Sequence, residues 1–342
     1  MQTKDKLAKM EHVKIAHDHV DFTDRIKKGT GTGALITGDI ANNIAEGNYS
    51  TAEGSHTNAT GIFSHAEGTG TTASENSAHA EGVITKATGQ YSHSEGFSTT
   101  ASGTYSHAEG QAAVASGVCS HAEGNSTTAS GGSSHAEGNQ TIASGENSHA
   151  EGYKTTASKY HAHAEGYYAS ASGSCAHAEG DSTTASGSQS HAEGRETTAS
   201  EYASHAEGYQ TTSSASYSHA EGYQTTSSGM NSHAEGVNTT ASGDGSHVEG
   251  WHTKATKYYQ HVSGKYNVED TGSGYLGTYA EIIGNGTADN ARSNARTLDW
   301  SGNEVLAGKL TVGAAPTADM DVATKKYIDD IISALRTELG LT

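Results

Sequence analysis

Residues 120–138, "SHAEGNSTTASGGSSHAEG", contain the same short motif twice. The Ser-His-Ala-Glu-Gly segment at 120–124 returns at 134–138, fourteen residues later, and this interval continues without insertion along residues 50–264. A fixed period is typical of repeat proteins, in which stacked units together bury residues that one unit could not. The repeat therefore decides the fold.

The composition excludes an ordinary globular core. Only 32% of the 342 residues are hydrophobic, and the chain has 43 glycines and one proline. Such a composition usually indicates disorder, but the strict period favours an ordered stack. The formal net charge of −19 argues against a nucleic-acid partner. No stretch reaches the roughly 18 apolar residues of a membrane span, so we expect no membrane insertion.

Fourteen residues equal two heptads, but a coiled coil fits this repeat poorly. Each unit carries about two glycines, which cost about 1 kcal/mol each in a helix, and lacks a Leu/Ile seam. The halves "SHAEGxx" and "TTASGxx" each combine a short alternating segment with glycine and two variable residues, which predicts strand and turn. We predict an all-β parallel solenoid of 16 coils. At about 4.8 Å per coil the rod is roughly 75 Å long.

The slots that hardly vary along the chain predict the interior. The residue after each histidine is almost always alanine, and so is its counterpart in the other half-unit, as at Ala143 and Ala157. Both columns should point into the coil. Glycines such as Gly68 and Gly82 should mark corners that need positive φ or close packing. The two slots after each glycine accept many residue types, so we expect exposed turns there.

Histidine and glutamate share the opposite strand face, two residues apart, and form what we call the His–Glu ladder. A solvated charge stripe is one interpretation. Because this face does not vary as the turns do, we favour a face buried against another chain. Lowering the pH through about 6.5 should then change the free energy of unfolding, in a direction that the sequence leaves open. The ladder comprises His65, Glu67, His79, Glu81, His93, Glu95, His107, Glu109, His121, Glu123, His135, Glu137, His149, Glu151, His163, Glu165, His177, Glu179, His191, Glu193, His205, Glu207, His219, Glu221, His233, Glu235, His247 and Glu249.

The repeat resembles the head repeat of YadA-type trimeric adhesins, a fourteen-residue unit of the pattern S-V-A-I-G followed by A-x-G. Ser120, Ala122 and Gly124 match the first half, and Ala129 and Gly131 match the second. The resemblance covers about residues 50–264. It implies a left-handed parallel β-roll and side-by-side association of three chains.

This chain departs from that family at two slots, where His121 replaces valine and Glu123 replaces isoleucine. We therefore expect a polar His–Glu seam between chains instead of an apolar one. "SHAEG" arrays of this kind resemble those in tail-fibre proteins of phages and prophages of Gram-positive bacteria. Residues 279–313 are similar to the segment that follows such arrays, with strands expected at Thr297–Trp300 and Glu304–Val312 around a turn.

The C-terminal "DVATKKYIDD" resembles the helical ending of tail-fibre chains, with Asp321 as the expected cap. Four apolar residues follow at coiled-coil spacing and predict a trimerising seam. This helix seam consists of Ile328, Ile332, Leu335 and Leu339.

The repeat is expected to hold no dedicated metal, cofactor or catalytic site. His-x-Glu pairs could take up Zn²⁺ or Ni²⁺ adventitiously, but a dedicated metal site is built once, so we predict no metal and no cofactor. Ser and His are neighbours and point to opposite faces, so they cannot act as nucleophile and base. A uniform rod offers no cleft for a carboxylate pair. We predict that the chain is not an enzyme.

Aromatic residues recur in the first slot after glycine. Cross-coil stacking is the structural interpretation, and contact with glycans or wall polymers is the functional one. These surface-contact candidates are Phe97, Tyr153, Tyr167, Tyr209, Tyr223 and Trp251. A Thr/Ser column, as at Thr100 and Ser102, also raises ice binding as a remote alternative, which Lys86, Val114, Ile142 and Lys254 interrupt.

Four segments are expected along the chain: an attachment region with a degenerate first coil (1–49), the repeat shaft (50–264), a small β connector (265–315) and the helix (316–342). The predicted function is that of a homotrimeric phage or prophage tail fibre. It would bind a tail or baseplate protein at one end and a host surface glycan or protein. The alternative is a bacterial trimeric surface adhesin. Residues 1–20 lack the apolar core of a signal peptide, so we expect a virion tail or cell-exterior location reached without one.

Overall fold

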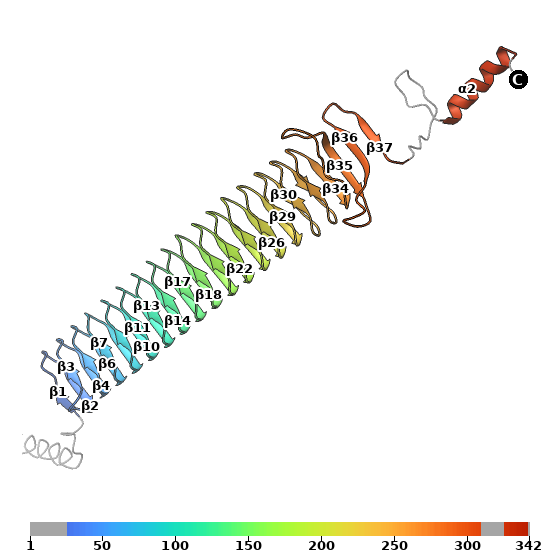
Figure 1. Cartoon of the computed structure of the whole chain (residues 1–342). Helices are drawn as coiled ribbons and strands as arrows, with labels where there is room; N and C mark the ends of the chain where they lie inside the picture. Colours follow the sequence, from blue (N-terminus) through green and yellow to red (C-terminus); the bar gives the residue numbers. More distant parts are fainter. Residues whose placement is uncertain (1–25, 309–324, 341–342) are drawn as a thin grey trace, which may run out of the picture.

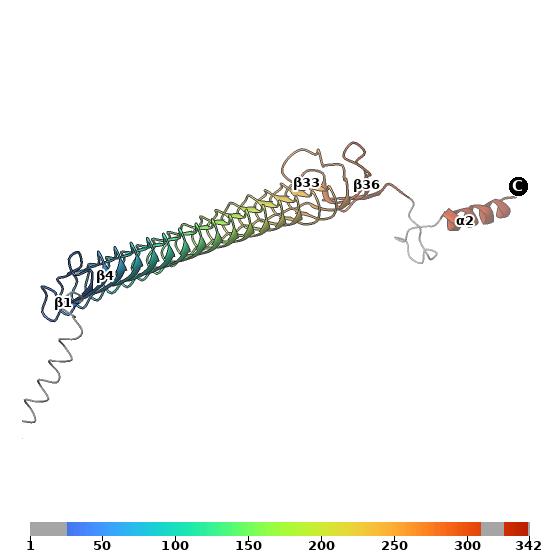
Figure 2. The same ribbon diagram turned by 90° about the horizontal axis from the view of Figure 1, so that it is seen from below.

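The computed structural model describes residues 26–308 and 325–340, most of which form an elongated stack of coils (Figure 1). Within the described residues each coil gives one strand to a 21-stranded sheet and one two-residue strand to a 16-stranded sheet. Paired residues are fourteen apart, as His121 and His135 show in the first sheet and Thr128 and Ile142 in the second. Seen from a second direction the stack is again far longer than it is wide (Figure 2). The predicted all-β solenoid is confirmed.

The coil strands of the first sheet, here called the long sheet, are β2 (Leu35–Gly38), β4 (Thr51–Ser55), β6 (His65–Thr69), β8 (His79–Val83), β10 (His93–Phe97), β12 (His107–Gln111), β14 (His121–Asn125), β16 (His135–Asn139), β18 (His149–Tyr153), β20 (His163–Tyr167), β22 (His177–Asp181), β24 (His191–Arg195), β26 (His205–Tyr209), β28 (His219–Tyr223), β30 (His233–Ala234), β32 (His247–Val248) and β34 (His261–Lys265).

The strands of the second sheet, the short sheet, are β3 (Ile44–Ala45), β5 (Asn58–Ala59), β7 (Thr72–Ala73), β9 (Lys86–Ala87), β11 (Thr100–Ala101), β13 (Val114–Ala115), β15 (Thr128–Ala129), β17 (Ile142–Ala143), β19 (Thr156–Ala157), β21 (Ser170–Ala171), β23 (Thr184–Ala185), β25 (Thr198–Ala199), β27 (Thr212–Ser213), β29 (Thr226–Ser227), β31 (Thr240–Ala241) and β33 (Lys254–Ala255).

Backbone hydrogen bonds join each coil to both neighbours. At the start of β14 the His121 amide donates to the Ser134 carbonyl of the next coil at 2.9 Å. In the following turn the Ser126 amide donates to the Gln111 carbonyl of the preceding coil at 2.8 Å. Because apolar side chains are small throughout, this continuous backbone ladder is a main source of cohesion between coils.

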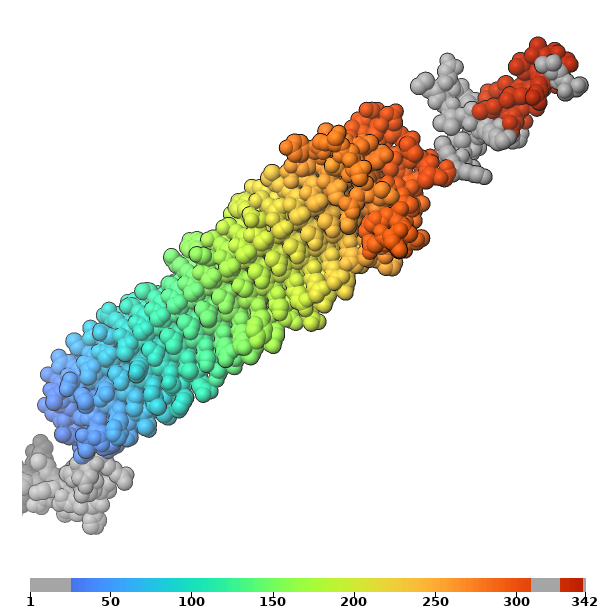
Figure 3. Space-filling view, viewed as in Figure 1, coloured from blue at the N-terminus to red at the C-terminus, as the bar shows by residue number. Residues whose placement is uncertain are grey.

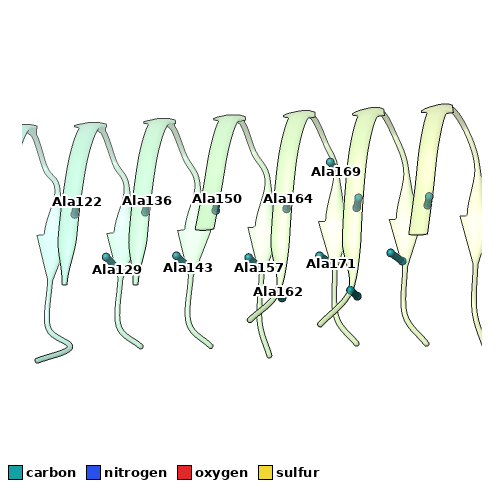
Figure 4. Close-up of a cluster of buried hydrophobic side chains, with 14 of the residues drawn as sticks. Ala122, Ala129, Ala136, Ala143, Ala150, Ala157, Ala162, Ala164, Ala169 and Ala171 are labelled. Atoms are coloured by element: carbon teal, nitrogen blue, oxygen red, sulfur yellow. The ribbon is translucent and has the colours of Figure 1, made fainter. Parts of the chain in front are cut away.

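Two alanine columns fill the interior, as predicted. Ala122, Ala136 and Ala150 of the long sheet and Ala129 and Ala143 of the short sheet are fully buried, and Figure 4 shows both rows repeating from coil to coil. Coils of this length leave room for little beyond a methyl group between the two sheets.

Two further columns are buried that the sequence reasoning did not assign. Ser120, one residue before His121, is buried, and its hydroxyl donates to the Gly117 carbonyl at 2.8 Å. Thr127, at the start of the second half-unit, is fully buried as well. The serine column thus ties the corner of the coil, and the threonine column fills the other end of the narrow interior.

The glycine after each ladder glutamate adopts a positive φ, as predicted, and Gly124 has φ +113°. A Cβ at Gly124 would lie 2.1 Å from the Gly138 carbonyl oxygen. The predicted placement at a corner is wrong, because β14 continues through Gly124 to Asn125. Left-handed turn residues lie two positions after each of the two glycines of a coil and in most coils are not glycine: Cys119 and Ser126 both have φ +56°.

Both ends of the long sheet carry antiparallel strands. At one end β1 (Ile26–Lys28) pairs with β2, and at the other β35 (Tyr279–Asn285) extends the stack in parallel with β34. It is followed by antiparallel β36 (Asn294–Asp299) and β37 (Glu304–Leu306). These last two confirm the strands predicted on either side of residues 301–303. Residues 309–312 of the second predicted strand lie outside the described residues.

A side chain closes the C-terminal end of the short sheet. The Asn267 amide accepts from the Lys254 backbone N–H at 2.8 Å and donates to the Lys254 carbonyl at 3.0 Å. The side chain thereby replaces the next strand and leaves no free backbone edge at β33.

The predicted C-terminal helix is present as α2 (Lys325–Glu338). Its expected cap, Asp321, lies outside the described residues. Ile328, Ile332 and Leu335 of the helix seam are 45%, 45% and 54% exposed, and Leu339 follows just beyond the helix. In the described part of the chain, no helix has the length and apolar character to span a membrane.

Candidate functional site: the His–Glu ladder

The ladder histidines form one continuous column of rings on the outer face of the long sheet. Strand β14 alternates half-buried His121 and Glu123 with fully buried Ala122. Ring centroids of consecutive histidines from His65 to His261 lie 4.5–5.0 Å apart. The rings are stacked throughout except around His149, whose ring is tilted against both neighbours. The parallel register therefore turns a repeated residue into a linear array.

Each ladder carboxylate lies between two successive imidazoles. In most coils the pair is internal, as for His107 Nε2 and Glu109 Oε2 at 3.6 Å. Near the C-terminal end the carboxylate faces the next coil, and Glu221 Oε1 lies 3.6 Å from His233 Nε2. Such distances exceed those of a good hydrogen bond. The carboxylates therefore approach the rings without bonding to them.

The ladder is half exposed, yet its imidazole nitrogens are shielded. Paired histidine side chains are 34–44% exposed and their glutamates 30–49%. All fifteen Nε2 atoms, from His65 to His261, are buried from water without a hydrogen-bond partner. Covering of this face by another chain stays a prediction.

Burial and stacking favour neutral imidazoles. Burial is the larger influence and lowers the pKa of His79, His135 and His205, with repulsion from neighbouring rings acting in the same direction. The facing glutamates, in the same coil and in adjacent coils, raise the pKa and offset only part of this. The same lowering holds for the pKa of His93, His121, His163, His191 and His219.

We expect acidification to destabilise the stack. The unfolded chain takes up protons at the ordinary histidine pKa of about 6.5, whereas the folded ladder resists them. The unfolded state therefore binds more protons, and the free energy of unfolding falls as pH drops below about 6.5. Urea midpoints at a series of pH values from 7.5 to 5 measure this.

A matched pair of variants assigns the pH effect to the ladder. The double change His135→Asn and His163→Asn removes two titrating rings and should flatten the pH dependence. His161→Asn changes an exposed turn histidine and should leave it unaltered. A urea midpoint that rises on acidification, or equal behaviour of the two variants, contradicts this account.

The residue before each ladder histidine, a serine in most coils, faces the other way. Ser120 is buried and donates to Gly117, while His121 lies on the outer face. The strand thus separates the hydroxyl from the imidazole, and this geometry does not form a nucleophile–base pair.

The aromatic candidates stack across coils and remain accessible. Tyr153 packs on Tyr167 with ring centroids 5.1 Å apart, and Tyr209 packs on Tyr223 at 5.2 Å. Phe97, Tyr167, Tyr223 and Trp251 are 49%, 50%, 46% and 53% exposed. Stacking therefore organises the column while leaving ring surface available to a partner.

The column considered for ice binding lies on the short sheet. Thr100 and Thr128 are half buried on its outer side, and Lys86 and Ile142 stand exposed in the same column. The charged and branched side chains interrupt the regular hydroxyl array.

The C-terminal end holds polar residues that the sequence reasoning missed. Asp270 is 5% exposed and accepts hydrogen bonds from the amides of Gly272, Thr278 and Tyr279. Buried Gln260 donates to the Tyr279 carbonyl at 3.1 Å. Gln260 occupies the slot that serine or alanine holds in the other coils, so this one large polar side chain was the available signal. These residues fasten the loop that closes the solenoid.

Comparison with known proteins gives no family assignment: neither a protein-family model nor a curated protein matches this chain.

Proposed function

We propose that this protein is a homotrimeric fibre segment of a phage or prophage-derived tail that contacts the host cell. Its shaft would be a left-handed β-roll of fourteen-residue coils, in three copies side by side as in the YadA-type heads that the repeat resembles. Its role would be structural and adhesive, without enzymatic activity. One end would join a tail or baseplate protein, and the other parts would meet a host surface glycan or protein.

The observation that carries this proposal is the unbroken His–Glu face. Fourteen coils present the same half-exposed pair while their turns vary freely. A face that keeps one chemistry along the whole rod suits contact with an equally regular surface, and a parallel copy of the same chain offers one. The half-exposed rings and carboxylates would be covered by the neighbouring chain in such an interface.

The helix seam supports the same assembly. A single helix of 14 residues is marginal on its own, and its apolar seam is exposed in the chain. Packing of three seams would bury these side chains and stabilise the helix.

A bacterial trimeric surface adhesin is the second candidate and would use the same rod. Gene neighbourhood separates the two, because a tail fibre should lie among tail and baseplate genes. Ice binding predicts thermal hysteresis of the purified chain, and its absence would end that alternative.

Host contact predicts binding to intact cells. A fluorescently labelled full chain should co-sediment with Gram-positive bacteria, and the double change Tyr223→Ala and Trp251→Ala should weaken this at least several-fold. The control Tyr91→Ala and Tyr105→Ala removes a stacked pair from the opposite turns and should bind normally. If the unaltered chain does not bind cells of any Gram-positive species in a broad panel, the adhesive role is contradicted.

A further inference from the structure

The ladder places three metal-ligating groups together at several intervals between coils. In each group two histidines of successive coils and the glutamate between them offer ligand atoms that all lie within 4.8 Å of one another. Groups of this kind are His65–Glu67–His79, His79–Glu81–His93, His107–Glu109–His121, His121–Glu123–His135 and His205–Glu207–His219. One strand alone offers only a histidine and a glutamate, whereas the register between coils adds a third ligand.

A second observation points to a ligand at the same atoms. The Nε2 atoms of these histidines are shielded from water and accept or donate no hydrogen bond. The carboxylate oxygens paired with these rings stay at 3.6–3.9 Å, beyond good hydrogen-bond distance. Buried polar atoms normally have partners, so an array of unpaired nitrogens beside carboxylates calls for one.

We infer that the His–Glu ladder binds divalent transition-metal ions such as Zn²⁺ or Ni²⁺, each between two successive coils. Imidazole nitrogen and carboxylate oxygen are ordinary ligands of these ions, and three protein ligands leave a coordination position for water.

Small side-chain movements complete the geometry. Ligands about 2.1 Å from a tetrahedral ion lie roughly 3.4 Å from one another, so the groups must close by an ångström or so. Half-exposed side chains on a rigid backbone can make this movement by rotation about their χ angles. The ion would then fasten one coil to the next.

Sharing of histidines limits the number of ions. His79 belongs to the groups on both sides of it, and so does His121. If each ion takes two rings, the fourteen ladder histidines together with His261 hold at most seven ions per chain. The site is complete within one chain, so it does not depend on the proposed trimer or on host contact.

Equilibrium dialysis with ZnCl₂ or NiCl₂ tests this inference on the untagged full chain at pH 7.5, with metal counted by mass spectrometry. We expect several ions per chain, up to seven, and release at pH 5. The triple change His107→Asn, His121→Asn and His135→Asn removes every histidine of the two groups that share His121, and should lower the saturating count by one or two. The control His56→Asn with His161→Asn alters two exposed turn histidines and should not lower it.

The unaltered chain gives an independent measure if a variant folds poorly. Saturating Zn²⁺ should raise its unfolding midpoint at pH 7.5, since an ion held by two coils stabilises the folded state, and EDTA should reverse the rise. Fewer than one ion per chain, equal losses in both variants, or an unfolding midpoint indifferent to Zn²⁺ would each overturn the inference.

Discussion

Replacing Gly124 by alanine is expected to lower the free energy of unfolding by at least about 3 kcal/mol. The residue has φ +113°, where an L-side chain is strained. The added Cβ would also lie 2.1 Å from the Gly138 carbonyl oxygen. That carbonyl belongs to the next coil and can retreat only by opening the parallel ladder, so strain and lost hydrogen bonds combine.

Gly132 provides a matched control eight residues away. It lies in a turn outside the left-handed region, and a Cβ there would meet nothing closer than 3.8 Å. Gly132→Ala should leave stability unchanged or raise it by up to about 1 kcal/mol through the unfolded state. Urea unfolding followed by circular dichroism compares the two. Equal urea midpoints for both variants would contradict the close approach of Gly124 to the next coil.

The variation of each repeat position between coils predicted much of the fold and could have predicted more. The alanine columns followed from slots that hardly vary, and period-two alternation then placed His121 and Glu123 on one outer face. The slot of Thr127 varies only to Ala113 and Ala169 and, in the first coil and at the cap, to Asn43 and Asn267, so the same rule identifies it as buried.

Other features depend on contacts between coils that the sequence does not display. The stacking of the histidine rings beside the carboxylates depends on the parallel register. It also depends on the side-chain rotamers that fit on the outer face of the long sheet. The exposed turns were predicted, but the left-handed conformation of Cys119 and Ser126 was not, because most coils have a residue other than glycine at these two positions. The strand-like cap formed by Asn267 depends on its hydrogen bonds with Lys254. These features could not be predicted from the sequence.

Assembly into a trimer is the second large expected effect and the centre of this account. In the isolated chain the His–Glu ladder is half exposed along the rod, and the helix seam is exposed as well. Association in parallel would bring three ladders and three seams together, with contacts repeated in every coil. Many weak contacts held in one register give high avidity, so we expect no monomer at micromolar concentration.

Variants separate the two contributions to assembly. Ile328→Asn with Ile332→Asn removes half of the helix seam and should weaken the trimer, which dilution would then reveal as dissociation. Replacing the outward carboxylates Glu109, Glu123 and Glu137 by lysine places extra positive charge beside the imidazoles of every chain and should weaken it further. The control Gln140→Lys lies in an exposed turn and should leave the assembly intact.

Multi-angle light scattering of the full chain at neutral pH tests the central claim most directly. The account predicts a mass three times 35.1 kDa, with dissociation only in the ladder and helix variants. A mass of 35.1 kDa that persists at high protein concentration would contradict it.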